Sequence, residues 1–335
     1  MNADKAVVAQ RDIDFYMISS DAGKSAGLPG STDKNTRVLI TGASGRIGQS
    51  LVSWLEQNTH FELILTSRRK PEFDSVRSVW IQGDLRNAGD LEKIFSYHPD
   101  VIVHLASSVG SKNPVSLMDF ENTELAPTLS MLGYILSKKL NARLVFASSG
   151  GTVYKDSSEP HSETDQVQGS SFYSCNKIYV ENLLWLYRDV LHPVVLRISN
   201  PFGMKVDPHI NQGIIDIAVS CALNNKTFSV FGALNNVRDF IHIDDLCRAF
   251  SQAIRFQGSV SYEVFNIGSG SGLSILQIME FVKKYFPEFK YSIDAKTCGD
   301  ISCSVLDVSK AAELLGWRPT VSVEEYLKSI SSTAG

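Results

Sequence analysis

The sequence lacks the features that would direct a protein to a membrane, to nucleic acid or to an oxidising compartment. None of its apolar runs reaches the roughly 18 residues needed to span a bilayer. It has no basic excess, since 32 Lys plus Arg stand against 36 Asp plus Glu for a net charge of −4, and nucleic-acid binders need a broad basic surface. Its 5 cysteines follow no regular spacing, and no zinc-binding pattern is present. We therefore expect a cytoplasmic protein without a membrane partner, a nucleic-acid partner or a metal.

What is present points to a layered α/β fold. Residues 1–35 are mixed and Gly-rich, lack the apolar core of a secretory signal, and are expected to form a flexible or loosely docked extension. From Arg37, short runs rich in Val, Ile and Leu alternate with helical segments, as in RVLIT, FELILT, VIVHLA and RLVFAS. Runs without polar alternation are typical of strands buried on both faces of a parallel sheet. The sequence therefore predicts a Rossmann-type doubly wound parallel sheet.

The length of the chain and a change of pattern after Asn200 suggest two lobes, because a domain usually holds about 150 residues. We assign residues 36–203 and 233–268 to the lobe that carries the large sheet. Residues 204–232 and 269–331 are assigned to a smaller lobe. The smaller, mainly C-terminal lobe is therefore expected to be discontinuous in sequence.

A glycine-rich turn, TGASGRIG, joins the first expected strand to the first expected helix. Glycines there let backbone N–H groups approach a pyrophosphate, which then sits on the N-terminus of the helix. A second run, GSGSG at 268–272, also follows a strand but does not open the first βαβ unit. We therefore predict a dinucleotide site at the first turn, with a plain tight turn as the alternative. The expected contacts are Gly42, Ser44, Gly45, Arg46, Ile47 and Gly48.

The end of the second expected strand indicates which dinucleotide binds. NAD-binding enzymes place an acid there for the ribose 2′-hydroxyl, whereas this chain has Arg68 and Arg69. Two guanidiniums suit a 2′-phosphate, so NADP is favoured over NAD, and a solvated basic loop is the alternative. His104, in the fourth strand, is interpreted as a packed residue. Further cofactor contacts are expected from Asp84, Leu85, Leu105, Ala106 and Ser107.

Tyr173 and Lys177 have the spacing of an acid–base pair. At i and i+4 the phenol and the ammonium lie on one helix face, and a nearby cation lowers the pKa of a tyrosine. Such a pair can exchange a hydroxyl proton while a nicotinamide exchanges the hydride. The spacing alone is weak evidence, because Tyr134 and Lys138 share it, but Tyr134 lies in an apolar helix where packing is expected.

Taken together, these motifs occur in the order found in extended short-chain dehydrogenases/reductases, and the chain resembles the UDP-glucose 4-epimerase type within that family. The resemblance spans about residues 36–331 and rests on TGASGRIG, GDL, HLA, SSGGTVY, YxxxK, NPFG, NQG, VRDFIHIDD and LDVSKAAELLGW. It implies an NAD(P)-binding lobe, a lobe that binds a nucleotide sugar, and a homodimer joined through two helices. It also implies that Tyr173 is the acid–base residue, with Lys177 lowering its pKa and bonding the nicotinamide ribose. The implied substrate contacts are Asn200, Asn211, Gln212, Gly213 and Arg238, the last with an ion pair to Asp239 or Asp244 as the alternative.

The segment SSGGTVY departs from the family pattern at a catalytic position. Family members carry a Ser or Thr three residues before the Val-Tyr pair, and this chain has Gly150 there. Ser149 or Thr152 is then expected to hold the sugar hydroxyl as the third catalytic group. Related dehydratases and decarboxylases carry acids at the positions of Gly151 and Thr152, so neither dehydration nor decarboxylation is expected.

The sequence therefore predicts a nucleotide-sugar 4-epimerase that oxidises C4 transiently and returns the hydride with bound NAD(P), an activity that serves polysaccharide biosynthesis. The alternative is an NADPH-dependent reductase of a 4-keto nucleotide sugar, which Arg68 and Arg69 favour. A nucleotide sensor without activity is disfavoured because the acid–base pair is intact. The family's diphosphate-gripping arginine is replaced by Thr297, beside Lys296, so substrate affinity or identity is expected to differ from the typical member.

Overall fold

A computed structural model describes most of the chain from Asn35 onward. The described ranges are 35–70, 77–107, 116–205, 213–231, 233–258, 260–294 and 301–334. They belong to one compact unit that spans Ser31–Gly335. Within these ranges, none of the helices is long and apolar enough to cross a bilayer.

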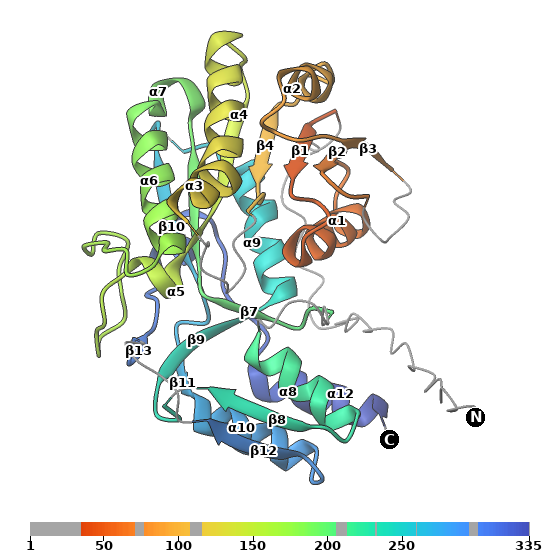
Figure 1. Cartoon of the computed structure of the whole chain (residues 1–335), viewed down its shortest axis with the longest axis vertical. Helices are drawn as coiled ribbons and strands as arrows, with labels where there is room; N and C mark the ends of the chain where they lie inside the picture. The colour runs from red at the N-terminus through yellow and green to blue at the C-terminus, as the bar shows by residue number, and fades with distance from the viewer. Residues whose placement is uncertain are drawn as a thin grey trace. The chain divides into compact units, whose positions relative to one another are not determined.

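Seven parallel strands form the main sheet, in the order β10-β6-β5-β4-β1-β2-β3 (Figure 1). Neighbouring strands pair in register, with Leu39 of β1 opposite Ile64 of β2 and Ile102 of β4. The predicted Rossmann-type doubly wound sheet is confirmed. Its strands are β1 (Arg37–Thr41), β2 (Glu62–Ser67), β3 (Ser78–Gln82), β4 (Val101–His104), β5 (Arg143–Ser149), β6 (Val194–Ile198) and β10 (Glu263–Ile267).

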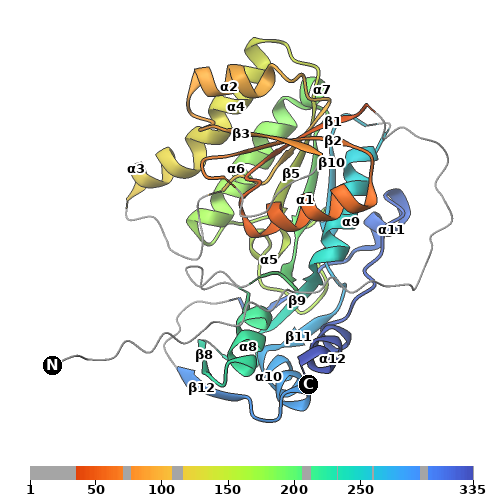
Figure 2. The same cartoon turned by 90° about the vertical axis from the view of Figure 1, so that its right-hand side faces the viewer.

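Helices cover both faces of this sheet, which explains why its strands are apolar without alternation (Figure 2). Successive strand residues point to opposite faces, so Val38 and Ile40 pack in one core and Leu39 in the other. The first face carries α1 (Arg46–Asn58), α9 (Ile243–Arg255) and α11 (Ser309–Leu314); the second carries α2 (Ala88–Phe95), α4 (Ala126–Ser137) and α6 (Phe172–Leu186). Shorter helical segments are α3 (Leu117–Phe120), the π-helical turn η1 (Glu121–Leu125), α5 (Gly150–Val153) and α7 (Arg188–Leu191).

A second group of elements has its own apolar core. Strand β9 (Val237–His242) pairs with β7 (Asn200–Phe202), β11 (Gly272–Ser274) and β13 (Cys303–Ser304), while β8 (Thr227–Phe231) pairs with β12 (Lys290–Asp294). The helices are α8 (Ile214–Leu223), α10 (Ile275–Tyr285) and α12 (Val323–Ala334). Residues 237–242 thus pair in a small sheet although we grouped them with the large one. The lobe boundaries themselves stay a prediction.

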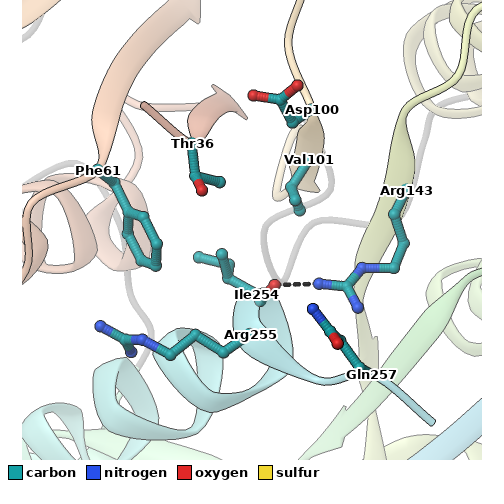
Figure 3. A pocket seen from close by; sticks show the side chains of 8 residues that line it. All are labelled: Thr36, Phe61, Asp100, Val101, Arg143, Ile254, Arg255 and Gln257. Atoms are coloured by element: carbon teal, nitrogen blue, oxygen red, sulfur yellow. Dashed lines mark hydrogen bonds between the residues drawn. The ribbon is translucent and has the colours of Figure 1, made fainter. Parts of the chain in front are cut away.

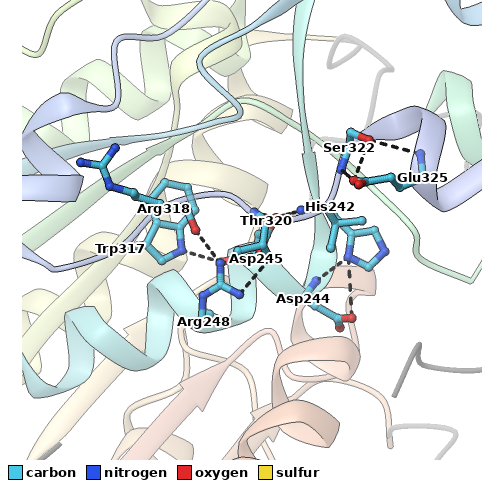
Figure 4. Close-up of polar contacts among 10 residues, drawn as sticks. His242, Asp244, Asp245, Arg248, Trp317, Arg318, Thr320, Ser322 and Glu325 are labelled. Carbon is cyan, nitrogen blue, oxygen red and sulfur yellow. Dashed lines mark hydrogen bonds and ion pairs between the residues drawn. The ribbon is translucent and has the colours of Figure 1, made fainter. Parts of the chain in front are cut away.

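A buried carboxylate ties the C-terminal segment to the start of α9 (Figure 4). Asp245 is fully buried and accepts hydrogen bonds from the backbone N–H groups of Thr320 and Val321, at 2.8 and 2.9 Å. Arg248 forms an ion pair with it at 2.7 Å, and the indole N–H of Trp317 donates to its carbonyl at 2.9 Å. These contacts fix the path of the chain between α11 and α12.

Candidate active site

The glycine-rich turn at the end of β1 is shaped for close approach to a ligand. Gly42 has φ +72°, and a Cβ there would lie 2.8 Å from the Cα of Ala106 and 2.9 Å from the carbonyl carbon of Leu105. A Cβ on Gly48 would lie 2.4 Å from the carbonyl oxygen of Gly42. Gly45 caps the 13-residue helix α1, and no side chain caps its first N–H groups. This N-terminus therefore fits a pyrophosphate. Ser44 and Ile47 lie in the same turn.

Two sequence patterns resemble parts of the site but have structural roles: the second glycine run and the pair of Tyr134 and Lys138. In the second glycine run, the N–H groups of Ser269 and Gly270 donate to the buried carboxylate of Asp239, at 2.7 and 3.1 Å. The loop therefore wraps an anion that belongs to the protein itself. Tyr134 stacks on Phe95 with ring centroids 5.3 Å apart, so its phenyl ring is a packing group.

The side chain of Arg46 leaves the phosphate loop and reaches α8. It forms an ion pair with the fully buried Asp216 at 2.7 Å and donates to the carbonyl of Lys205 at 3.2 Å. Asp216 also accepts the N–H groups of Gly203 and Met204 at 2.7 and 3.4 Å. Burial raises the pKa of this carboxyl to about 6, against the opposing effect of these N–H groups and of Arg46. We did not predict Asp216, whose only signal in the sequence is an acid in the first turn of a helix.

The expected adenosine side of the site brings Arg68 and Asp84 near each other. Arg68 and Arg69 are exposed after β2. Asp84 forms an ion pair with Arg86 at 2.5 Å. The hydrogen bond from the Arg86 side chain, helped by the charges of Arg86 and Arg68, holds the pKa of that carboxyl below its usual range. Leu85 is buried beside them. Of the expected cofactor contacts, Arg68 and Asp84 therefore interact through their charges.

Beyond the end of β4, Ser107 donates a hydrogen bond to the buried carboxylate of Glu124 at 2.9 Å. His104 is the last residue of β4, three residues before Ser107. Its Nδ1 lies 2.7 Å from the hydroxyl of Thr41 and its Nε2 lies 3.0 Å from the hydroxyl of Thr128. Burial lowers the pKa of His104 to about 3, so its ring is neutral at physiological pH. The interpretation of His104 as a packed strand residue is supported.

Lys177 is buried under the end of β5, on the same helix as Tyr173. Its Nζ donates to the carbonyl of Ala147 at 2.8 Å and lies 5.4 Å from the centroid of the Tyr173 ring. Burial lowers the pKa of the amine to about 8, against the opposing charges of Glu124 and Glu181. The helix presents both side chains as their spacing predicts.

Tyr173 has a raised pKa rather than a lowered one. Burial is the main cause; a hydrogen bond with Ser149 opposes it and the charge of Glu124 adds to it. The lowering effect that we predicted for Lys177 stays a prediction, whereas the net pKa of Tyr173 is raised. The net rise follows because desolvation of the phenol outweighs the hydrogen bond with Ser149.

The third hydroxyl of the site comes from two linked residues. Thr152 donates to the Ser149 hydroxyl at 2.8 Å, and Ser149 is the group that bonds Tyr173. Gly150 has no room for a side chain, because a Cβ there would lie 2.6 Å from Leu306 and 2.9 Å from the carbonyl of Arg197. Both candidate hydroxyls therefore belong to one hydrogen-bond chain that runs from Thr152 through Ser149 to Tyr173.

Of the predicted substrate contacts, Asn200 lies beside α5, facing Gly151, and donates to the carbonyl of Asp239 at 2.8 Å. Gly213 has φ +89° at the start of α8, next to the guanidinium of Arg46. Arg238 donates to the carbonyls of Val237 and Ile301, at 2.9 and 2.5 Å. Asn211, Gln212, Lys296 and Thr297 lie outside the described residues.

A buried ion pair beneath the site was not predicted. Glu181 and Arg197 pair at 2.7 Å, and Ser148 donates to the same carboxylate. Arg197 also donates to the Tyr154 phenol at 2.8 Å. The signal in the sequence is spacing, since Glu181 follows Lys177 by one further helix turn. The ion pair joins α6 to β6, and the Ser148 contact joins the same helix to the end of β5.

A separate pocket of about 220 Å³ lies at the opposite edge of the sheet (Figure 3). Thr36, Val101 and Arg143 stand at the amino ends of β1, β4 and β5, whereas the phosphate loop follows the carboxyl end of β1. Arg143 donates there to the carbonyl of Ile254 at the end of α9. This pocket therefore contributes nothing to the acid–base site.

Comparison with known proteins gives a consistent set of relatives. Residues 38–268 match the model described as the NAD dependent epimerase/dehydratase family. A dTDP-4-dehydro-6-deoxyglucose reductase of Escherichia coli is 29% identical and is aligned over 88% of this chain and 97% of its own. The UDP-glucose 4-epimerase of Thermotoga maritima, solved with UDP-glucose, superposes with a TM-score of 0.78 at 29% identity, covering 88% of this chain and 97% of its own. The Thermus thermophilus UDP-glucose 4-epimerase, solved with NAD, gives 0.79 at 26% identity and covers 89% and 98%.

Proposed function

The chain belongs to the NAD dependent epimerase/dehydratase family, and from that premise we propose that it is a nucleotide-sugar 4-epimerase. One observation carries the proposal: Tyr173, its hydrogen-bond partner Ser149 and the buried Lys177 lie at the carboxyl edge of the sheet that also bears the phosphate loop. Ligands of doubly wound sheets bind at that edge. The T. maritima and T. thermophilus relatives are epimerases of the same fold.

The phosphate loop fits the pyrophosphate of a dinucleotide, because Gly42 and Gly48 leave no room for a Cβ and the N-terminus of α1 has no side-chain cap. When bound, the nicotinamide supplies hydride transfer to and from the sugar. Lys177 holds one N–H on the carbonyl of Ala147 and keeps its other donors for the ribose. Ser107, Asp84 and Leu85 are the proposed contacts toward the adenosine and the ribose.

In this proposal Tyr173 takes the proton of the C4 hydroxyl during oxidation and returns it during reduction. Ser149 orients that hydroxyl and the phenol, and Thr152 fixes Ser149 in turn. Gly151 and Thr152 carry no acid, so the site has no group there to expel water or to promote loss of a carboxylate. We therefore propose neither a dehydratase nor a decarboxylase activity.

A second candidate is an NADPH-dependent reductase of a 4-keto nucleotide sugar. The E. coli relative is named as a reductase, and the exposed Arg68 and Arg69 suit a consumable phosphorylated cofactor. In this candidate Tyr173 only donates its proton. The sugar and the nucleotide are the same class in both candidates.

One experiment separates the two candidates. The purified protein is incubated with UDP-sugars without added cofactor, and the C4 epimers are followed by chromatography. Interconversion without net cofactor oxidation supports the epimerase. Stoichiometric NADPH oxidation with a 4-keto sugar, and no interconversion without it, supports the reductase and contradicts the epimerase.

We propose that NADP is preferred over NAD, because guanidiniums rather than an acid follow β2 and one of them acts on Asp84. The T. thermophilus relative was solved with NAD, so the preference needs a direct test. Arg68→Ala should weaken NADPH binding about tenfold or more, the worth of a charge-assisted hydrogen bond, and leave NADH unchanged. Equal loss for both cofactors, or tighter wild-type binding of NADH, would remove the preference.

We propose that residues 204–232 and 269–331 form the lobe that binds the nucleotide sugar. Asn200 and Arg238 border this lobe through β7 and β9, and Asn211, Gln212 and Gly213 precede α8. Their amide and guanidinium donors suit a diphosphate and a base. Arg238→Ala should raise the KM for the nucleotide sugar more than it lowers kcat.

We propose that two chains associate through α4 and α6. Leu129, Tyr179 and Leu186 are 37%, 44% and 63% exposed on these helices, and an interface would bury these apolar side chains. Sedimentation of Leu186→Glu should give a monomer where the wild type gives a dimer. Leu314→Glu on α11, exposed to 52%, is the control and should leave the dimer intact.

We also propose a reducing, cytoplasmic location. In the described part of the chain Cys175, Cys221, Cys247 and Cys303 are free thiols, as expected where thiols stay reduced. Recovery of the native protein in the cytosolic fraction would agree with this, and recovery outside the cell would not.

A further inference from the structure

The amino edge of the main sheet carries exposed apolar side chains that the proposed function leaves unused. Trp185, Tyr187 and Val190 are 51%, 44% and 47% exposed, at the end of α6 and in the short helix α7. Both helices precede β6, and Figures 1 and 2 show α7 and the end of α4 at the same end of the main sheet. A large exposed aromatic group of this kind calls for a partner.

These side chains lie apart from the proposed interface between two chains. That interface includes Leu186, and successive residues of a helix point about 100° apart. Trp185 therefore projects from a different side of α6. Tyr187 and Val190 follow the end of that helix and belong to the next turn of chain.

Basic side chains gather around the apolar ones. Lys138 and Lys139 are exposed just after α4, a helix that packs in the same core as α6. Residues 138–143 and 185–192 together hold four Lys or Arg and one Asp, for a local charge of +3, whereas the whole chain carries −4. This end of the sheet is therefore basic in an acidic protein, which favours an anionic partner.

Other acids at this edge already have cations of their own. Asp100 pairs with Arg37 at 3.8 Å, and Glu263 pairs with Lys310 at 2.7 Å. The positive charge of the two lysines is therefore not offset by these carboxylates.

One contact joins the two chemistries. The guanidinium carbon of Arg188 lies 4.2 Å from the centroid of the Trp185 ring, and its Nη1 donates to the Trp185 carbonyl at 2.8 Å. Indoles favour the level of lipid headgroups, and guanidiniums bind phosphate. We call the six residues the amino-edge surface: Lys138, Lys139, Trp185, Tyr187, Arg188 and Val190.

We propose that the amino-edge surface docks reversibly on a bilayer that contains anionic lipid. The lysines and Arg188 face the lipid phosphates, while Trp185, Tyr187 and Val190 enter the headgroup level. An aliphatic group such as Val190 gains from burial in lipid but cannot stack on a base, so lipid is favoured over nucleic acid. The acid–base site lies at the carboxyl edge of the same sheet and stays open to solvent in the docked protein.

This proposal revises one expectation and is independent of the proposed function. We expected no membrane partner because no run of residues is long enough to span a bilayer. Contact with headgroups needs no such run. The docking would be found equally for an epimerase and for a reductase.

The test is flotation of the full chain with vesicles of phosphatidylcholine, alone or mixed with phosphatidylglycerol. We expect binding to the mixed vesicles, little binding to phosphatidylcholine, and weaker binding at high salt. The double variant Lys138→Gln, Lys139→Gln should bind the mixed vesicles about tenfold more weakly or less still, because each cation near an anionic surface adds to the affinity. Trp185→Ala should also weaken binding, and a blue shift of tryptophan emission on binding should shrink in Trp185→Phe.

Matched variants from the second group of elements separate this surface from general charge and hydrophobicity. The double variant Lys283→Gln, Lys290→Gln removes the same charge from exposed positions of α10 and β12 and should bind as the wild type does. Ile293→Ala removes an apolar side chain that is 56% exposed on β12 and should also bind normally. Circular dichroism and thermal unfolding verify that each variant is folded.

No binding to the mixed vesicles, or equal binding to both kinds of vesicle, would overturn the inference. Equal losses in the control variants would do the same. Binding to polyuridylate in place of vesicles would assign the surface to nucleic acid and so overturn the lipid proposal. Vesicle binding by a protein without epimerase activity would contradict only the proposed function.

Discussion

Burial moves the pKa values of the two side chains of the acid–base pair in opposite directions. Burial lowers the pKa of Lys177 to about 8 and raises that of Tyr173. Both effects favour the uncharged form, as expected when ionisable groups leave water. The phenol therefore needs a further stabilising charge when it acts as a base, and a bound oxidised nicotinamide supplies one in the proposed site.

Replacing the phenol should abolish turnover while the protein stays folded. Tyr173→Phe removes the proton donor and acceptor, so we expect kcat to fall by about 10²–10⁴, the range of general acid–base catalysis. Tyr134→Phe is the matched control, because Tyr134 shares the spacing to a lysine but stacks on Phe95. Steady-state kinetics and NADPH binding measure both variants. Full activity of Tyr173→Phe, or equal loss in Tyr134→Phe, would refute the assignment.

Lys177 should cost the protein stability near neutral pH. Burial moves the pKa of the amine from 10.5 to about 8, so between these values the unfolded chain binds the proton and the folded chain does not. The stability of the wild type should therefore rise with pH across this window. Lys177→Met should be inactive but more stable at pH 7, by roughly 1–3 kcal/mol after the lost bond to Ala147. Urea unfolding at pH 7 and 10 tests this, and a less stable variant at pH 7 would contradict it.

At the scale of elements, two glycine runs with similar sequences do different work. The first run leaves the N-terminus of α1 without a side-chain cap, whereas the second closes around Asp239. The difference follows from the surroundings of each loop. The first loop lies at the carboxyl edge of the main sheet, where ligands bind, and the second lies next to a buried aspartate. Spacing of glycines alone does not distinguish the two.

A methyl group in the phosphate loop should impair cofactor binding. Gly48→Ala places a Cβ 2.4 Å from the carbonyl oxygen of Gly42 and 2.9 Å from the Cα of Ala43, so the backbone must shift. We expect at least tenfold weaker NADPH binding and a loss of about 1–3 kcal/mol in stability. Gly133→Ala in α4, where no atom lies within 4 Å, should bind normally and gain up to about 1 kcal/mol. Fluorescence titration and urea unfolding check both, and normal binding by Gly48→Ala would argue against a ligand at this loop.

The main sheet could be predicted because its strands are short, continuous apolar runs such as Val101–His104, and their order follows from βαβ connections. The pairing of Val237–His242 could not, because its partner strands come from segments far apart in sequence. Ser149 and Thr152 could be named but not ranked, since only the folded α5 brings their hydroxyls together.

Glu124 could not be predicted, and the reason is local geometry. In a regular helix an acid just before an apolar stretch reads as a solvated first turn. The π-helical turn adds a residue to the turn and so changes which side chain faces the sheet. No residue type in the segment predicts a π-helical turn. Which side chains of the helix face the sheet could therefore be known only from the structure.

At the scale of the whole described unit, one ion pair links the phosphate loop to the second group of elements. Arg46 is the first residue of α1, which packs in the first core, and Asp216 lies in the first turn of α8, which packs in the third. The carboxylate also receives N–H groups from the segment that follows β7. The pair therefore fixes the start of α8 to the glycine-rich loop.

Breaking this pair from the arginine side should be costly. Arg46→Ala leaves the buried Asp216 carboxylate without its cation, so we expect a loss of roughly 3 kcal/mol at pH 8. Because burial raises the pKa of Asp216 to about 6, protonation should shrink the loss at pH 5. Arg37→Ala, from an exposed pair with Asp100 at 3.8 Å, is the control and should cost less than about 1 kcal/mol. Unfolding curves at both pH values measure the loss of stability. An equal loss at pH 5 and pH 8 would be inconsistent with a buried charge.

The position of Arg46 has a thermodynamic consequence for turnover. A dinucleotide that orders the phosphate loop also orders the residue that holds α8, and a nucleotide sugar that orders α8 acts back on the loop. Linkage requires the two effects to be equal, so each ligand tightens the other by the same factor. Such reciprocity would keep the cofactor in place for as long as a sugar is bound, which suits an enzyme that borrows a hydride and returns it within one encounter.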